Sequence, residues 1–256
     1  MYPVLIEIGH FQVRSYGLAV ALAFLAGAWV ARREAWRRGL DPALVADFLL
    51  YALVAGLLGA RLYYVLVFQP GWYLARPWDV FAVWQGGLAM HGGLLAGLGA
   101  AVWYARRNRL GFLAFADTLT PGLALGQAIG QLACLLSGDS FGKPTTLPWA
   151  ITFTDPWAMA PRGVPLHPLQ VYEFLAYLAT FGLVWAARRH RSRPGALLAL
   201  YAGAYGTVRF FLEFLRASPP VLFGVVVPQA VSLALVAAAL LFAVGRWTQA
   251  RSLASR

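Results

Sequence analysis

The stretch Trp84-Gln85-Gly86-Gly87-Leu88-Ala89-Met90-His91-Gly92-Gly93 sets a histidine between two glycine pairs. It opens an apolar run that continues to about residue 105 and is long enough to cross a bilayer. An ionisable side chain is costly in hydrocarbon, so a histidine in such a run indicates a functional position. Glycine carries no side chain, which lets a ligand or another backbone approach the imidazole. We therefore expect His91 to take part in chemistry inside a membrane protein.

The composition indicates the same class of protein. Of the 256 residues, 60% are hydrophobic and 12% are charged, whereas soluble domains are about 45–50% apolar and about 25% charged. Apolar runs of spanning length recur, and the period-two alternation of a membrane barrel is absent. The sequence predicts an all-α, polytopic membrane protein that forms one integral membrane domain over residues 1–256.

Seven spans are expected, near residues 15–31, 46–67, 87–105, 113–136, 169–187, 196–215 and 225–244. Arginine blocks follow the first, third, fifth and seventh spans: Arg32, Arg33, Arg37 and Arg38; Arg106, Arg107 and Arg109; Arg188, Arg189, Arg191 and Arg193; Arg246, Arg251 and Arg256. Basic residues favour the cytoplasmic side, so the N-terminus is expected outside and the C-terminus in the cytoplasm. Because the arginines flank the spans, we expect the net charge of +11 to interact with lipid headgroups rather than with nucleic acid.

The longest connection, residues 137–168, is expected to form an ordered extracytoplasmic cap. It is rich in proline and contains Trp149 and Trp157, whose amphipathic rings favour the headgroup level. No convincing internal repeat is present, which weakens the case for an inverted-repeat transporter.

Polar residues inside or beside the spans are the candidates for a functional site. They are Tyr16, Arg61, His91, Gln131, Cys134, Asp139, Tyr172, Glu173, Arg209, Glu213 and Arg216. Arg209, Glu213 and Arg216 follow i, i+4 and i, i+3 spacing, so they share a helical face that must turn away from lipid.

Most of these candidates have a structural alternative. The three charges on one face are also what an ion-pair ladder between helices requires. Arg61 could snorkel to the nearer interface, and Tyr16 could anchor the first span there. Tyr172 and Glu173 could fix the start of a span by hydrogen bonding, and Cys134 could be a small packing residue. For the histidine, the alternative is a neutral imidazole bonded to a backbone carbonyl.

The residue types indicate an anionic, phosphate-bearing substrate. Imidazole exchanges a proton near neutral pH, and arginine binds phosphate through bidentate, charge-assisted hydrogen bonds. The sequence contains no metal-binding motif, no nucleotide-binding loop and no Gly-x-Ser-x-Gly elbow, so neither a metal nor a cofactor is expected. The single cysteine, Cys134, excludes an internal disulfide.

An ordered set of motifs runs through most of the chain. They are Tyr16-Gly17, Gly59-Ala60-Arg61, Trp84 to Gly93, Gly126-Gln127 through Gly142, His167-Pro168-Leu169-Gln170-Val171-Tyr172-Glu173, and Arg209 to Arg216. Any one of them alone is weak evidence. Together, in this order on seven spans, they resemble the bacterial prolipoprotein diacylglyceryl transferase family.

This resemblance implies a reaction in the bacterial cytoplasmic (inner) membrane. The family transfers a diacylglyceryl group from phosphatidylglycerol to the lipobox cysteine thiol of a signal-peptide-bearing preprolipoprotein, and glycerol phosphate leaves. By resemblance, His91 is the base for the thiol, Arg209 holds the lipid phosphate, Tyr16 is required for activity, and Asp139 completes the catalytic set. The residues expected to bind substrate are Arg61, Gln131, Cys134, Gly142, Tyr172, Glu173, Glu213 and Arg216. Membrane lipids are the other expected partners.

The family signature is altered at three positions. Gln131 stands where the family has arginine, Cys134 where it has asparagine, and Asp139 where it has glutamate. Gln131 lacks the guanidinium charge that would stabilise a departing phosphate, and the loss of one such contact costs about 10²–10³ in rate. Two alternatives to lipoprotein transfer therefore remain: a divergent membrane enzyme of the same fold that acts on another lipid or acceptor, and a non-catalytic lipid transporter.

Overall fold

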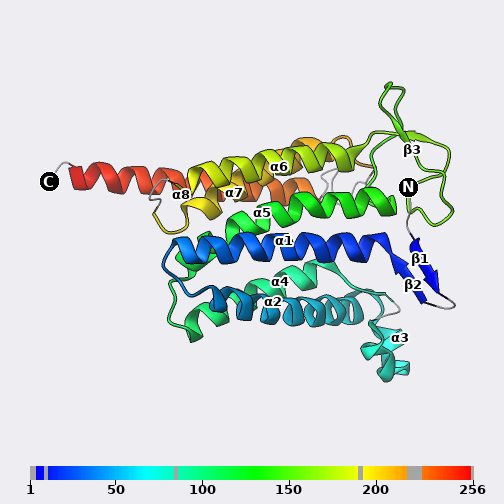
Figure 1. Cartoon of the computed structure of the whole chain (residues 1–256), viewed down its shortest axis with the longest axis horizontal. Helices are drawn as coiled ribbons and strands as arrows, with labels where there is room; N and C mark the ends of the chain where they lie inside the picture. Colours follow the sequence, from blue (N-terminus) through cyan, green and yellow to red (C-terminus); the bar gives the residue numbers. More distant parts are fainter. Residues whose placement is uncertain (1–3, 9–10, 84–85, 190–192, 218–226, 255–256) are drawn as a thin grey trace. The chain divides into compact units, whose positions relative to one another are not determined.

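The computed structural model describes residues 4–8, 11–83, 86–189, 193–217 and 227–254 (Figure 1). Its contacts group into two compact units. Unit 1 comprises Met1–Ala31 with Leu119–Arg256, and unit 2 comprises Arg32–Thr118. Two parts of the predictions lie outside the described residues. They are Trp84 and Gln85 of the motif around His91, and residues 225–226 at the start of the seventh expected span.

Within the described ranges, a helix lies over each of the seven expected spans. These helices are α1 (Ser15–Arg37), α2 (Pro42–Tyr63), α4 (Met90–Arg107), α5 (Phe112–Ser137), α6 (Leu169–Ala187), α7 (Ala196–Glu213) and α8 (Val227–Ala254). Five of them are long and apolar enough to cross a membrane, namely α1, α2 with the π-helical turn η1 (Tyr64–Phe68), α5, α6 and α8. An all-α membrane protein is therefore confirmed. The crossings by α4 and α7 stay predictions.

In unit 2, α2 and α4 pack side by side through glycine (Figure 1). A Cβ atom at Gly59 would lie 2.6 Å from the Gly92 carbonyl oxygen, and one at Gly93 would lie 3.2 Å from the Gly56 carbonyl oxygen. Small residues are the usual means of bringing two membrane helices into close contact. This contact sets the start of α4, because Ala89 N–H donates to the Ala60 carbonyl at 3.0 Å. The short helices α3 (Pro70–Ala75) and η2 (Pro77–Phe81) lie between α2 and α4 in the chain.

In unit 1, α1 meets α5 in the same way. A Cβ atom at Gly27 would lie 2.7 Å from the Gly122 carbonyl oxygen. Helix α7 packs between α6 and α8, and a Cβ atom at Gly206 would lie 2.7 Å from the Ser232 carbonyl oxygen of α8. These close approaches bring α1 against α5 and α7 against α8.

Two small antiparallel sheets were not expected from the sequence. Strand β1 (Val4–Ile8) pairs with β2 (Phe11–Arg14), and β3 (Ile151–Thr152) pairs with β4 (Pro165–Leu166). The second sheet belongs to the segment 137–168, which folds over a core of its own made by Phe153, Ala160 and Leu166. The segment is thus ordered, and its place outside the membrane stays a prediction.

Candidate functional site

Four charged side chains form a closed ion cluster at the end of α7. Glu173, near the start of α6, places Oε1 at 2.7 Å from Arg209 Nη1 and at 2.5 Å from Arg216 Nη2. Glu213 Oε2 lies 3.2 Å from Arg209 Nη2 and 3.3 Å from Arg216 Nε. Each carboxylate therefore contacts both guanidinium groups. Arg209 and Glu213 share a face of α7 as expected, whereas Arg216 lies just beyond the end of that helix and α6 adds the fourth charge.

The cluster is neutral when all four groups are ionised, which is the condition under which charges can be buried. The side chains of Glu173 and Glu213 are 1% and 0% exposed, and Arg216 is 10% exposed. Arg209 keeps 19% of its side chain exposed. Of these four groups, Arg209 is the one best placed to contact an anion.

The C-terminal end of α5 folds back beside this cluster. Asp139 N–H donates to the Cys134 carbonyl at 3.0 Å, and Gly138, with φ +73°, provides the left-handed turn that ends the helix. Gln170 Nε2 of α6 donates to the Asp139 carbonyl at 2.7 Å. The Asp139 carboxylate accepts from Ser140 N–H at 2.6 Å. The loop is therefore held from α5, from α6 and by its own carboxylate.

Cys134 and Tyr16 join this group of residues. The Cys134 thiol lies close to the Ser140 side chain and within electrostatic range of Asp139, Glu173 and Arg216. Tyr16, near the start of α1, lies within electrostatic range of Cys134 and Asp139. Unit 1 therefore brings together residues that the sequence places at four separate positions along the chain.

Gly142 has a packing reason to be glycine. It is buried, and a Cβ atom there would lie 2.6 Å from His167 Cβ and 2.7 Å from the His167 carbonyl oxygen. Its neighbour Lys143 donates its N–H to the Leu215 carbonyl at 2.8 Å and accepts from His167 N–H at 3.0 Å. Gly142 itself forms a β-bridge with Arg216. This loop thus fixes the chain just beyond α7, where Arg216 stands.

Tyr172 faces a different neighbour from Glu173. Its hydroxyl accepts a hydrogen bond from Trp149 Nε1 at 2.7 Å, and its ring lies 6.2 Å from that of His167. Tyr172 therefore ties the segment 137–168 to α6. This contact matches the structural alternative for Tyr172, and its predicted part in substrate binding stays a prediction.

A polar and aromatic column continues from the ion cluster, and the sequence prediction missed two of its members, Tyr177 and Tyr201. Tyr201 of α7 donates its hydroxyl hydrogen bond to Gln127 Oε1 of α5. Its ring stacks on Tyr205 at 6.0 Å, and Tyr205 packs on Tyr177 of α6 at 5.6 Å. The spacing of Tyr201, Tyr205 and Arg209, four residues apart on α7, is the signal that could have found it.

Gln131 lies one helical turn beyond Gln127 on the same face of α5. Cys134 follows on that face, so Gln131 stands between the tyrosine column and the ion cluster. Gln131 Oε1 is buried, and no described residue gives it a hydrogen bond. A buried carbonyl oxygen without a donor is unfavourable, so this position is suited to a ligand or water that donates to it.

In unit 2, His91 is exposed in the first turn of α4. Its ring centroid lies 6.3 Å from that of Tyr63. Arg61, by contrast, is buried, and its guanidinium donates to backbone carbonyl oxygens. His91 belongs to unit 2 and Arg209 to unit 1, so a common role of the two in catalysis stays a prediction.

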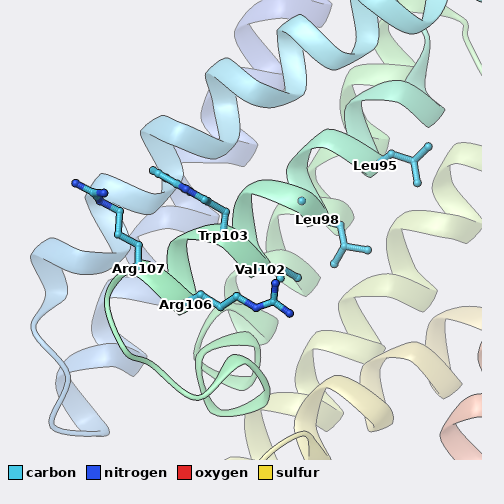
Figure 2. Close-up of a pocket in the computed structure, with 7 residues that line it drawn as sticks. Leu95, Leu98, Val102, Trp103, Arg106 and Arg107 are labelled. Carbon is cyan, nitrogen blue, oxygen red and sulfur yellow. The ribbon is translucent and has the colours of Figure 1, made fainter.

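The surface of α4 also carries an open hollow of about 770 Å³ (Figure 2). Leu95, Leu98, Val102 and Arg106 project to one side of the helix, and Trp103 and Arg107 project to the other. None of the residues that line this hollow is a predicted site residue. Within the described part of the chain, no group of three histidine, cysteine, aspartate or glutamate side chains is arranged to hold a metal ion.

Comparison with known proteins identifies the family. The family model for prolipoprotein diacylglyceryl transferase matches residues 3–245. The chain belongs to this family. The family predicted from the motifs is therefore confirmed, and with it a multi-pass bacterial membrane protein.

Relatives of the same name cover most of the chain. The phosphatidylglycerol–prolipoprotein diacylglyceryl transferase of Geobacter sulfurreducens is 37% identical over 84% of this chain and 82% of its own length. That of Thermosynechococcus vestitus is 38% identical over 91% of this chain and 88% of its own length. That of Gloeobacter violaceus is 37% identical over 96% of this chain and 91% of its own length. The match thus spans both structural units.

Proposed function

We propose that this chain transfers a diacylglyceryl group from phosphatidylglycerol to the lipobox cysteine thiol of a preprolipoprotein and releases glycerol phosphate. The match to the transferase family over residues 3–245 carries this conclusion. The sequence prediction of this function agrees with the names of the relatives. The ion cluster supports it, because Arg209 is the most exposed of its four side chains and a guanidinium binds phosphate through charge-assisted hydrogen bonds.

The proposed reaction is a single substitution at carbon. His91 removes the proton from the substrate thiol, which becomes the stronger nucleophile as thiolate. The sulfur attacks the glyceryl carbon that carries the phosphate ester. The carbon–oxygen bond breaks, a thioether forms, and the bonding electrons leave with the phosphate oxygen. Arg209 stabilises the charge on that oxygen.

Arg209 has donors left for this task. A guanidinium carries five N–H groups, and Glu173 and Glu213 engage one nitrogen each, Nη1 and Nη2. These two carboxylates hold the plane of the guanidinium, so less conformational entropy is lost when a phosphate binds. Tyr16 and Asp139, on the Cys134 side of the cluster, complete the proposed catalytic set.

The proposed setting is the bacterial cytoplasmic (inner) membrane. Seven spans in one integral membrane domain, with the N-terminus outside, follow from the arginine blocks. The segment 137–168 then lies on the outer side, where exported preprolipoproteins and the headgroups of the outer leaflet meet. Phosphatidylglycerol reaches the site laterally from the surrounding lipid.

Purified protein in vesicles that contain phosphatidylglycerol tests the proposal. A lipobox peptide is added, and its mass is followed. The expected product carries a thioether-linked diacylglyceryl group and appears together with glycerol phosphate. Folded protein that gives no such adduct would exclude the transfer reaction.

A second candidate is a membrane enzyme of the same fold with another lipid or acceptor. Gln131 and Cys134 favour it, since the family's arginine and asparagine are absent at these positions. Complementation of a transferase-depleted bacterium separates the two, because rescue of growth requires lipoprotein transfer. A non-catalytic transporter would instead move lipid and leave the peptide mass unchanged.

A further inference from the structure

The Arg61 guanidinium donates hydrogen bonds to backbone carbonyls that lie 18 to 26 residues further along the chain. Its Nε donates to the Val80 carbonyl at 2.9 Å, and Nη2 donates to the Asp79 carbonyl at 2.5 Å. Its Nη1 donates to the carbonyls of Gly86 at 2.6 Å and Gly87 at 3.1 Å. The backbone therefore accepts four hydrogen bonds from a group that has five N–H donors.

The guanidinium is also confined by its surroundings. Arg61 is 5% exposed, and its charge lies over the Tyr73 ring at 5.2 Å. A Cβ atom at Gly87 would come within 2.6 Å of Arg61 Nη1. Gly86 and Gly87 both have positive φ, +87° and +71°, so this turn requires glycine. The turn and the arginine fit each other closely.

The same turn leads directly into the helix that carries the histidine. After Gly87, Ala89 N–H donates to the carbonyl of Ala60, the residue before Arg61. Helix α4 begins at Met90, and His91 is its second residue. The last turn of α2 thus holds the chain at two points just before His91.

We propose that Arg61 is a positioning residue for His91, through the backbone of Gly86 and Gly87. The guanidinium fixes the turn, and the turn fixes where α4 begins and where the imidazole stands. This assigns Arg61 a role other than the predicted contact with substrate, and it rests on the proposed function for its kinetic consequence. A displacement of about 1 Å at a reacting group costs on the order of 10²-fold in rate.

Arg61→Lys tests the proposal, since lysine keeps the charge but cannot span four carbonyls from one planar group. The full chain is placed in nanodiscs that contain phosphatidylglycerol. Carbethoxylation of His91 by diethylpyrocarbonate is followed by peptide mass spectrometry, together with kcat and KM for lipid. We expect a several-fold change in His91 modification rate and a fall in kcat of about 10²-fold, with KM near the wild-type value.

A matched glycine pair tests the same point without changing Arg61. Gly87→Ala pushes against the guanidinium and against the Tyr64 ring, whereas a Cβ atom at Gly86 meets nothing within 4 Å. Both substitutions carry the strain of a positive φ. We therefore expect Gly87→Ala to change His91 modification and kcat more than Gly86→Ala does. This pair tests whether the position of the turn controls His91 even where Arg61→Lys fails to fold.

Three results would overturn the proposal. They are an unchanged His91 modification rate in folded Arg61→Lys protein, equal behaviour of the two glycine variants, and a raised KM with unchanged kcat. The last result would make Arg61 a direct lipid ligand. If the wild-type chain forms no thioether product, the transfer function fails, but the comparison of His91 modification still tests the positioning role.

Discussion

Replacing Glu173 by glutamine tests whether one buried carboxylate holds both arginines of the ion cluster. Glu173 Oε1 contacts Arg209 and Arg216 at 2.7 and 2.5 Å, and its side chain is 1% exposed. Glutamine keeps the shape and removes the negative charge. Two guanidinium groups then share Glu213 alone, and the buried cluster carries a net positive charge.

The magnitude follows from the burial of the pair. Removing one partner of a buried ion pair costs about 3–5 kcal/mol. Arg209 keeps 19% exposure, so water offsets part of the loss and the lower value of about 3 kcal/mol applies. A chain of this size loses about 2–4 °C in Tm per kcal/mol, which predicts a decrease of about 6–12 °C. The freed Arg209 also loses its orientation, so we expect kcat to fall by about 10²-fold.

The assay pairs thermal unfolding in lipid nanodiscs with transfer kinetics below the Tm. Glu34→Gln is the matched control, because Glu34 is also 1% exposed and bridges two arginines, Arg37 and Arg38, far along α1 from Tyr16. The control should lower Tm and leave kcat unchanged. A Glu173→Gln protein with the wild-type Tm and kcat would refute the role given to this carboxylate.

Three further substitutions test other parts of the site. His91→Gln should reduce transfer by about 10²–10⁴-fold if the imidazole is the thiol base; wild-type rates would exclude that role. Gln131→Arg should raise the transfer rate by restoring a phosphate-binding charge, and a rate that falls would show that the cluster admits no third guanidinium. Gly142→Ala should lower the free energy of unfolding by about 1–3 kcal/mol, because the added methyl group overlaps His167. Gly130→Ala is the control and should not lower it, because a Cβ atom there meets nothing within 4 Å.

The helices were predictable because the length of an apolar run depends only on consecutive residues. Even Pro121, inside α5, does not end that helix, since surrounding helices can compensate for a lost backbone hydrogen bond in a membrane protein. The strands β3 and β4 have two residues each, which is too short for a period-two pattern to appear. The core of Phe153, Ala160 and Leu166 depends on contacts between turns, which no local pattern shows.

The site was predictable where its residues are close in the sequence. Arg209 and Glu213 follow from helical spacing on α7 and Arg216 lies three residues further on, whereas Glu173 reaches Arg209 across 36 positions through the packing of α6 on α7. Arg61 shows the limit more clearly. Its position in an apolar run predicts a functional charge, but the carbonyls that bind it lie 18 to 26 residues further along the chain.

The altered signature residues are better understood as one face of α5 than as separate losses. That face carries Gln127, Gln131 and Cys134. Gln127 accepts a hydrogen bond from Tyr201, and Cys134 lies within electrostatic range of Arg216. The ion cluster at that level is already neutral, so a third guanidinium from residue 131 would need a counter-ion of its own. A phosphate can supply one only while substrate is bound. In the substrate-free protein, the neutral amide of Gln131 is therefore less destabilising than an arginine would be, and phosphate binding is left to Arg209.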